Sequence, residues 1–332
     1  MKAVKIIDST LRDGMHSVSH QFTIEQMEKI ATALDEAGVY AVEVSHGDGL
    51  GGSSIQYGFS LHSDEEYLNA VSKVLRRAKL AILLLPGIGT QKDLAIAKAA
   101  GVSVARVATH VTEADIAQQH IELSKDLGME SINFLMMAHM APLDVMLQNA
   151  RLMESYGADA VYVVDSAGFM LPDEVADRIK AMKDSLGCNV GFHGHNNMDL
   201  AIANVLAAVN NGADFIDSSL CSMGAGGGNA STEVVAAVLD RYGVTSGLNL
   251  FKSIDAAELI IPLKPKTDED VSSKLLLGYA GVYSSFMLHA ERASKRFNVD
   301  ARDILVELGR RKVVGGQEDM IIDVAYEMSR NT

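Results

Sequence analysis

The stretch Tyr156-Gly157-Ala158, followed by Val161-Tyr162-Val163-Val164, contains the pattern that predicts the fold. A helical segment ends at a glycine, which is a common helix C-cap, and a short run of β-branched and aromatic residues follows. The same pattern recurs with its glycine at Gly38, Gly101, Gly128, Gly187 and Gly212. From Gly101 onward the spacing is about 25 to 30 residues, the length of one helix–strand unit. The chain therefore repeats a β/α unit.

Two more apolar runs, Val4–Ile7 and Leu80–Leu85, bring the expected strands to eight. Helical patterns lie between the strands, at Ile24–Ala37, Gln91–Ala100, Glu113–Leu127, Pro142–Tyr156, Pro172–Leu186 and Met198–Asn210. Eight such units in about 250 residues predict an α/β protein with a (β/α)₈ TIM barrel. A doubly wound sheet is the alternative, but it rarely contains eight units of this regularity.

The repeat stops near residue 250. We expect one long helix over Leu275–Phe297, then helices over Ala301–Arg311 and Gln317–Ser329. The sequence thus predicts a barrel domain over residues 1–250 and a helical C-terminal domain over residues 251–332. The apolar faces of so small a domain must pack on the barrel, on another subunit, or on both.

The composition indicates a soluble globular protein. The chain has 332 residues, of which 48% are hydrophobic and 22% charged, and only two are cysteines. We expect a reducing cytoplasm, because two cysteines make a disulfide framework unlikely. The N-terminus shows no signal-peptide architecture, and no apolar stretch approaches the 18 or so residues that span a membrane. The net charge of −14 argues against nucleic-acid and membrane-surface partners. A small anionic substrate remains compatible with it, since a local arginine and a metal ion dominate the field inside a pocket.

Two motifs carry candidate metal ligands. The segment Asp8–Gly14 ends the first strand, and His193-Gly194-His195 ends a later one. Histidines at i and i+2 of a strand point to one face, so both can reach one ion, and Asp13 can complete the set. The alternative is an exposed acidic turn, with Arg12 paired to Asp8 or Asp13, and two unrelated histidines.

The barrel favours the metal site, because TIM barrels carry their catalytic groups at the C-terminal ends of their strands. The candidate residues Arg12, Asp13, Asp165, His193 and His195 all fall at such ends. We therefore predict a divalent-metal site with open positions for substrate and water.

Six segments carry a resemblance to a known family: Arg12–His16, His46–Ser54, Met140–Pro142, Tyr162–Gly168, Leu277–Phe286 and Glu307–Lys312. Together with the His-x-His pair, they resemble the metal-dependent lyases and synthases that include isopropylmalate synthase and 3-hydroxy-3-methylglutaryl-CoA lyase. Within that group, the chain is most similar to the 4-hydroxy-2-oxovalerate aldolases, the pyruvate aldolases of aromatic meta-cleavage pathways. The resemblance covers essentially the whole chain. His16 and the C-terminal segments separate it from the synthases and the CoA lyase.

The resemblance implies a Mn²⁺-type ion and cleavage of 4-hydroxy-2-oxopentanoate to pyruvate and acetaldehyde. It also implies that the helical domain communicates with a partner, an acylating acetaldehyde dehydrogenase that receives the aldehyde within a heterotetramer. Carried over onto this chain, the metal ligands are Asp13, His193 and His195, and Arg12 steadies the pyruvyl enolate. His16 is the general base, Ser166 contacts the substrate carboxylate, and Tyr283 closes over a substrate that also lies against Asp13 and His193.

The chemistry explains these residue types. Breaking the C3–C4 bond leaves electrons on C3 as an enolate, which a Lewis-acidic ion and the permanently protonated Arg12 stabilise. A neutral histidine suits removal of the C4 hydroxyl proton.

Several alternatives stay open. Ser166 could cap the next helix, and Tyr279 shares a helical face with Tyr283, so that only the resemblance favours Tyr283. Asn196 and Asn197 stand where the family often has a further histidine. The sequence also does not choose among Mn²⁺, Mg²⁺, Co²⁺ and Zn²⁺. The other histidines are expected to be structural or exposed: His20, His46, His62, His110, His120, His139 and His289.

Two glycine-rich stretches invite functional interpretation. Gly47–Gly52 matches Gly-x-Gly-x-x-Gly after a strand, but no helix pattern follows directly, so we expect a flexible loop at the barrel mouth. For Gly224–Asn229, the resemblance points to a loop near the active site, with Asn229 outside the direct ligands.

Two rival functions remain. One is a synthase or lyase acting on acyl-CoA with the same metal ligands, and the other is a non-catalytic scaffold subunit.

Overall fold

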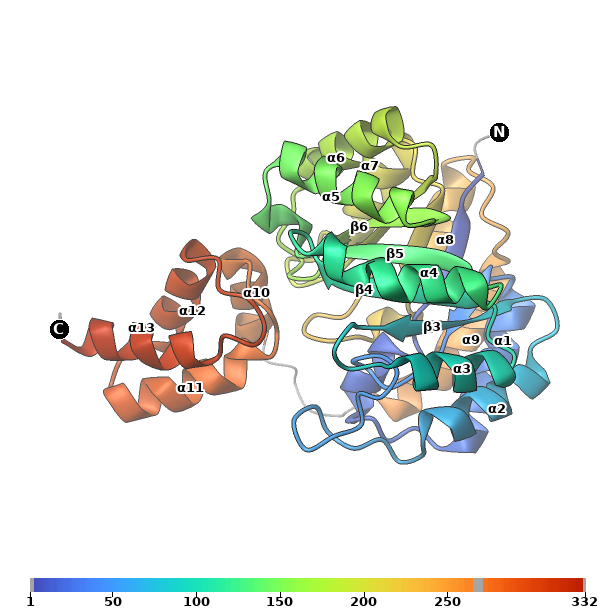
Figure 1. Ribbon diagram of the computed structural model, residues 1–332. Helices are drawn as coiled ribbons and strands as arrows, with labels where there is room; N and C mark the ends of the chain where they lie inside the picture. Colours follow the sequence, from blue (N-terminus) through green and yellow to red (C-terminus); the bar gives the residue numbers. More distant parts are fainter. Residues whose placement is uncertain (1–2, 265–270, 331–332) are drawn as a thin grey trace.

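The computed structural model describes residues 3–264 and 271–330. Eight parallel strands close into a barrel in chain order, and β1 pairs with β8 to complete it (Figure 1). The strands are β1 (Lys5–Asp8), β2 (Ala41–Glu43), β3 (Lys79–Leu84), β4 (Val104–His110), β5 (Glu130–Met136), β6 (Ala160–Asp165), β7 (Asn189–Gly194) and β8 (Phe215–Ser218). The closure confirms the predicted TIM barrel and excludes an open doubly wound sheet.

Helices surround the strands: α1 (Ile24–Ala37), α2 (Asp64–Val74), α3 (Gln91–Ala99), α4 (Gln118–Asp126), α5 (Leu143–Ser155), α6 (Pro172–Ser185), α7 (Ala201–Asn210), α8 (Thr232–Arg241) and α9 (Leu250–Ile260). Helix α9 packs against α1 and α8 of this outer layer. The helix expected over Glu113–Leu127 begins instead with a 3₁₀ turn at Ala114–Ala117, and α4 follows it.

Gly38 shows why a glycine ends these helices. It adopts a left-handed conformation with φ +93°, and its N–H reaches back to the last turn of α1. A Cβ atom there would lie 2.3 Å from the carbonyl oxygen of Gly247, so no other residue fits without movement. Gly187 is the exception to the predicted pattern, because α6 ends at Ser185 and the residue that caps it, Leu186, is extended.

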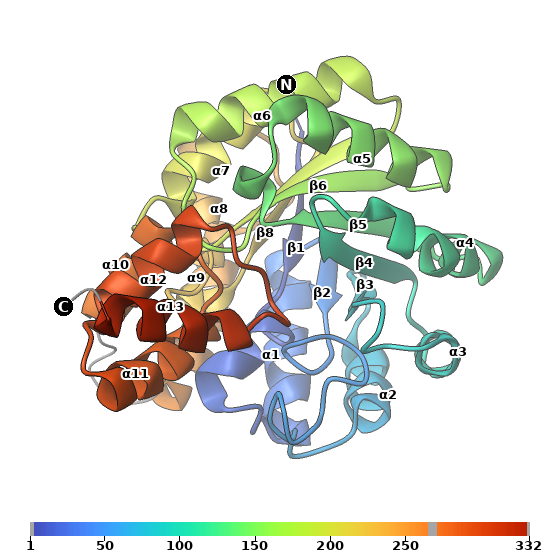
Figure 2. The ribbon, with the colours of Figure 1, turned by 60° about the vertical axis from the view of Figure 1, so that its left-hand side comes forward.

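A separate group of four helices follows the barrel: α10 (Val271–Ala280), α11 (Phe286–Phe297), α12 (Ala301–Arg310) and α13 (Asp319–Ser329). These helices lie beside the barrel mouth and share their own apolar core (Figures 1 and 2). The expected single helix over Leu275–Phe297 is therefore wrong. The chain turns at Gly281, which has φ +66°, and helix α11 starts only at Phe286.

The break changes which apolar residues face outward. Val282 and Phe286 are fully buried in the core of the helical group, so neither contributes to a partner-facing surface. The large apolar side chains exposed on these helices are Leu275, Tyr279, Leu288, Val306, Ile322 and Tyr326.

Within the two described ranges, no helix combines the length and apolar character needed to cross a membrane.

Candidate active site

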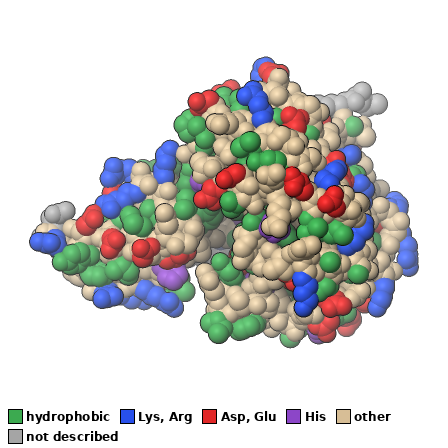
Figure 3. All heavy atoms as spheres, in the orientation of Figure 1, with side chains coloured by type: hydrophobic (Ala, Val, Ile, Leu, Met, Phe, Trp, Pro, Cys, Tyr) green, Lys and Arg blue, Asp and Glu red, His purple; other side chains and the backbone are tan. Residues whose placement is uncertain are grey.

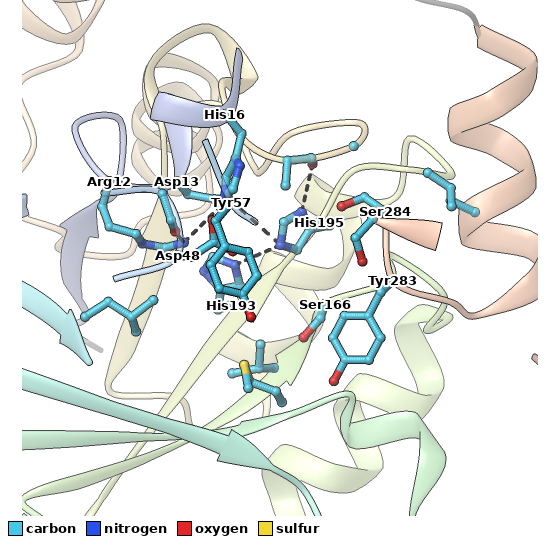
Figure 4. A pocket seen from close by; sticks show the side chains of 18 of the residues that line it. Arg12, Asp13, His16, Asp48, Tyr57, Ser166, His193, His195, Tyr283 and Ser284 are labelled. Atoms are coloured by element: carbon cyan, nitrogen blue, oxygen red, sulfur yellow. Dashed lines mark hydrogen bonds and ion pairs between the residues drawn. The ribbon is translucent and has the colours of Figure 1, made fainter. Parts of the chain in front are cut away.

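A cavity of about 640 Å³ lies at the C-terminal ends of the strands. Its walls come from the barrel mouth and from the helical group, and the surface is hollowed where the two meet (Figure 3). Seven residues expected at the site line this cavity: Arg12, Asp13, His16, Ser166, His193, His195 and Tyr283. Figure 4 shows them around one space. The sequence thus predicted side chains that the fold brings together from both ends of the chain.

Asp13, His193 and His195 form a compact group of potential metal ligands. One ligand atom from each lies within 4.8 Å of the other two. The two Nε2 atoms are 3.4 Å apart, and Nε2 of His195 is 3.9 Å from Oδ2 of Asp13. All three side chains are largely buried.

The hydrogen bonds on the far side of each histidine ring identify its tautomer. Nδ1 of His195 donates to the carbonyl oxygen of Ala225 at 3.1 Å, and Nδ1 of His193 lies 2.8 Å from Oδ2 of Asp217. With both protons on Nδ1, the Nε2 lone pairs face each other and the Asp13 carboxylate. Such an electron-rich arrangement is stable around a cation, and the outer partners are those that orient metal-binding histidines. The residues therefore fit a divalent ion.

The pKa values of these groups also favour metal binding. Burial opposes ionisation of Asp13, but the charge of Arg12 and the neighbouring histidines outweighs it and holds the pKa well below its usual range. Burial lowers the pKa of His195 to about 4. At neutral pH these groups are a carboxylate and a neutral imidazole, the forms that bind metals.

The glycine-rich loop after β8 closes against the same group. The side-chain amide of Asn229 donates to Oδ2 of Asp13 and to the carbonyl oxygen of Met223. A Cβ atom at Gly224 would lie 2.7 Å from that Asp13 oxygen, so the loop needs a glycine to approach. Asn229 therefore orients a candidate ligand without needing to bind the ion itself.

Arg12 does not pair with Asp8. Its Nη1 lies 3.0 Å from Oδ1 of Asp13, and its Nε donates to Oε2 of Glu43 at 2.8 Å. Asp8 instead accepts hydrogen bonds from the backbone of Thr10 and the hydroxyl of Thr232. The guanidinium is thus held at the cavity wall by two carboxylates.

A buried ion network, which sequence reasoning missed, runs through the barrel interior. Nη1 of Arg106 lies 3.1 Å from Oε1 of Glu43, and its Nη2 contacts both Asp217 oxygens at 2.6 and 2.7 Å. Arg106 is fully buried, and its guanidinium lies 4.2 Å from the ring centre of Phe134. Since Glu43 holds Arg12 and Asp217 holds His193, the network joins both sides of the site. In the sequence, this network is indicated by a single charged residue within each of three strand-like apolar runs.

His16 lies in a 3₁₀ turn, η1 (Asp13–Val18), directly after the first motif. Its Nε2 is 4.0 Å from Oδ1 of Asp13. Two other histidines back it: the His20 ring packs edge-on against His16, and His46 stacks on His20 with ring centres 3.9 Å apart. His20 and His46 are both buried, which agrees with the structural role expected for them.

Ser166 and Tyr283 occupy the side of the cavity away from His16 (Figure 4). The Ser166 hydroxyl accepts from the backbone of Met137 at 3.2 Å and does not cap α6, whose N-cap is Leu171. Burial raises the pKa of Tyr283. Tyr279 is 66% exposed and does not line the cavity, because the break at Gly281 separates the two tyrosines.

Asp165 ends β6 but does not reach the cavity. Its buried carboxylate accepts hydrogen bonds from the backbone of Phe169 and Met170, both at 2.9 Å. Burial raises its pKa to about 6. Asp165 therefore shapes the loop after β6.

The Gly47–Gly52 loop does not form a dinucleotide site. Helix α2 begins only at Asp64, so no helix N-terminus follows the glycines. A Cβ atom at Gly47 would lie 2.6 Å from Nε2 of His16, and one at Gly52 would lie 2.5 Å from Nδ1 of His46. These glycines let the loop pack against the histidines at the barrel mouth.

The fold and the site together define a (β/α)₈-barrel protein with a candidate divalent-metal centre at its mouth. Residues 3–260 match the HMGL-like family, and residues 270–330 match the DmpG-like communication domain. The carboxyl transferase domain of Rhizobium etli pyruvate carboxylase superposes with a TM-score of 0.81, over 99% of this chain and 61% of that one. At 17% identity, that likeness shows the fold alone.

Named relatives identify the family to which this barrel protein belongs. The 4-hydroxy-2-oxovalerate aldolase of Geobacillus stearothermophilus is 59% identical, over 98% of this chain and 96% of its own length. That of Carboxydothermus hydrogenoformans is 58% identical, over 99% and 98%. The chain belongs to the 4-hydroxy-2-oxovalerate aldolase family, whose members are carbon–carbon lyases.

Proposed function

We propose that this enzyme is a divalent-metal-dependent aldolase that cleaves 4-hydroxy-2-oxopentanoate to pyruvate and acetaldehyde. The observation that carries the proposal is the convergence of Asp13 and the two facing Nε2 atoms of His193 and His195 beside the Arg12 guanidinium. This arrangement suits a substrate with a carboxylate and an adjacent carbonyl oxygen, because both are anionic or become so during the reaction.

Asp13, His193 and His195 would hold the ion, for which we propose Mn²⁺. When bound, the ion supplies a Lewis acid that stabilises the negative charge of the enolate. Arg12 contributes fixed donors for the same charge, and its two carboxylate contacts keep those donors at the cavity wall. Because the guanidinium is already oriented, little reorganisation is needed as charge develops.

His16 is the proposed general base. It takes the proton of the C4 hydroxyl while the C3–C4 bond breaks, so that C4 becomes the carbonyl carbon of acetaldehyde and the bonding electrons pass to C3. Transfer of this proton to C3 of the enolate then completes pyruvate and returns His16 to its neutral form. The support from the structure is that His16 is on the cavity wall, beside but outside the ligand group. Its ring is 26% exposed, so the substrate can reach it.

Ser166 and Tyr283 are proposed to position the substrate. Ser166 would contact the carboxylate through its hydroxyl proton, since its oxygen already accepts from the Met137 backbone. Tyr283 would close over the substrate from the segment between α10 and α11, which forms one wall of the cavity.

The helical group is proposed to bind an acylating acetaldehyde dehydrogenase in a heterotetramer. Two observations support this. Residues 270–330 match a domain described as a communication domain, and the same segment forms part of the cavity wall while exposing Leu275 and Leu288 elsewhere. A partner at this surface would receive acetaldehyde without its release to solvent.

Cys188 and Cys221 are free, which supports a role in the reducing cytoplasm.

The test is aldol cleavage by metal-stripped protein, with pyruvate release coupled to lactate dehydrogenase. We expect activity to require added Mn²⁺. His195→Ala should lose both bound metal and activity, whereas His289→Ala, a matched change at an exposed histidine on α11, should lose neither. A second arm supplies acetyl-CoA and a 2-oxo acid. Condensation in that arm, without cleavage in the first, would contradict the proposal and indicate an acyl-CoA synthase.

A further inference from the structure

A second group of potential metal ligands lies beside the first. One ring nitrogen from each of His16 and His20, and one carboxylate oxygen of Asp48, lie within 4.8 Å of one another. Ligand atoms at about 2.0–2.2 Å from a tetrahedral zinc ion are roughly 3.3–3.6 Å apart. Small rotations of the partly exposed His16 and Asp48 side chains would therefore close these three atoms around an ion.

The backbone holds His20 in place. Ser19 and His20 have φ values of +51° and +61°, a left-handed conformation that is uncommon for residues other than glycine. Two successive residues in this conformation carry strain, which the surrounding packing must sustain. The turn returns the His20 ring toward His16, against which it packs edge-on with ring centres 5.0 Å apart.

His46 supports the group without being available as a ligand. Its Nδ1 accepts from the backbone N–H of Asp48 at 3.1 Å, and its Nε2 donates to the carbonyl oxygen of Gly58 at 3.2 Å. Both ring nitrogens are thus occupied. The flat stack of His46 on His20, with an interplanar angle of 14°, fixes the plane of the His20 ring.

His20 has a ligand atom to offer. Only 6% of the surface of His20 is exposed, and among the described residues its buried Nδ1 has no hydrogen-bond partner. Burial lowers the pKa of His20 to about 3, so the ring is neutral at physiological pH. Asp48 and His16 both line the open cavity, which provides a path for an ion and its remaining water ligands.

We propose that His16, His20 and Asp48 form a second, inhibitory metal site that binds Zn²⁺ or a similar late first-row divalent ion. Two imidazoles and a carboxylate suit zinc, and affinity for such sites rises from Mn²⁺ toward Cu²⁺ and Zn²⁺. An ion there would use the His16 lone pair, so His16 could no longer accept a proton. Binding at this site stands on the geometry alone, whereas inhibition rests on the proposed role of His16 as the base.

The second site should be the weaker of the two. Nε2 of His16 is 4.0 Å from Oδ1 of Asp13, so two ions at neighbouring sites would repel each other. Excess zinc is therefore needed to fill it.

The experiment counts zinc by calorimetric titration of metal-free protein. Wild type should bind two ions per chain, Asp48→Asn one at the first site, and His195→Ala one at the second. Asp144→Asn, a change at an exposed aspartate on α5, should behave as wild type. His20→Gln, which keeps a donor and an acceptor, provides an independent route to loss of the second ion.

Inhibition is measured with enzyme saturated in Mn²⁺ and increasing Zn²⁺. Each enzyme is compared with its own Mn²⁺-dependent rate without zinc, and Asp48→Asn should raise the zinc concentration that halves this rate at least about 10-fold, since even outer partners of a metal site have effects of this size. Equal inhibition of wild type and Asp48→Asn would overturn the proposal, because zinc would then act by replacing Mn²⁺ at the first site. A single zinc per wild-type chain would also overturn it. If wild type shows no aldol cleavage, the proposed function fails, but the zinc count still tests the second site.

Discussion

Replacing Arg106 by methionine should destabilise the barrel strongly. The change removes the charge but keeps an unbranched apolar stem among Phe134 and Tyr162. Arg106 contacts Glu43 at 3.1 Å and Asp217 at 2.6 Å, and all three side chains are essentially excluded from solvent. Glu43 would retain Arg12 as a partner, but Asp217 would retain no cation that is permanently charged.

The magnitude follows from the cost of an unpaired buried charge. Removing one partner of a buried ion pair costs about 3–5 kcal/mol. At about 2 °C of melting temperature per kcal/mol, as for larger domains, the expected loss is roughly 6–10 °C. The assay is a thermal melt of metal-free protein, because bound metal would add its own stabilisation. A variant that melts within about 1 °C of wild type would refute the reasoning.

A neutral version of the network separates charge from packing. Combining Arg106→Met with Glu43→Gln and Asp217→Asn removes all three charges with little change of shape, and it should recover most of the lost stability. The single variant should also bind Mn²⁺ about 10–100-fold more weakly, since Arg106 would no longer fix the Asp217 carboxylate that orients His193. If the triple variant is as unstable as the single one, packing rather than charge explains the effect.

Three further predictions concern other parts of the molecule. His16→Ala should retain one Mn²⁺ per chain but lower kcat about 10²–10⁴-fold, and an unchanged kcat across neutral pH would assign the base elsewhere. Leu288→Glu, on the exposed face of α11, should weaken co-elution with the acylating dehydrogenase in size-exclusion chromatography while leaving aldol cleavage intact. Asp8, whose pKa burial raises to about 6 from 3.8, binds its proton more tightly in the folded state, so the stability it contributes is present below pH 3.8 and is lost as pH rises to about 6. In Asp8→Asn, the decline in the free energy of unfolding over that range should therefore be about 3 kcal/mol smaller than in wild type. Denaturant midpoints that change equally with pH in the two proteins, from pH 4 to 7, would contradict this.

The barrel was readable from the sequence because its signals are local. A glycine that ends a helix and a β-branched run that follows act over a few residues, and the eight-fold repeat leaves few ways to arrange the strands. The His-x-His pair was readable for the same reason, since the two-residue period of a strand places His193 and His195 on one face. Asp13 could be assigned to the same site because the C-terminal ends of the strands meet at one rim of a closed barrel.

The buried network was beyond such reasoning. Glu43, Arg106 and Asp217 each stand alone within an apolar strand-like run, and they come from β2, β4 and β8. Only closure of the barrel brings their charges within 3.1 Å. The packing of His20 and His46 behind His16 depends equally on contacts between separate loops.

The helical group shows another limit of prediction from the sequence. Helical periodicity continues from Leu275 to Phe297, so the sequence does not reveal where the chain turns. Gly281 adopts φ +66° there, and α12 approaches so closely that a Cβ atom at Gly309 would lie 1.8 Å from the carbonyl oxygen of Ala280. An apolar residue pattern cannot distinguish a domain's own core from a surface for a partner, because both exclude water. Tertiary packing made that distinction, burying Val282 and Phe286 and turning Tyr283 toward the cavity while Tyr279 faces solvent.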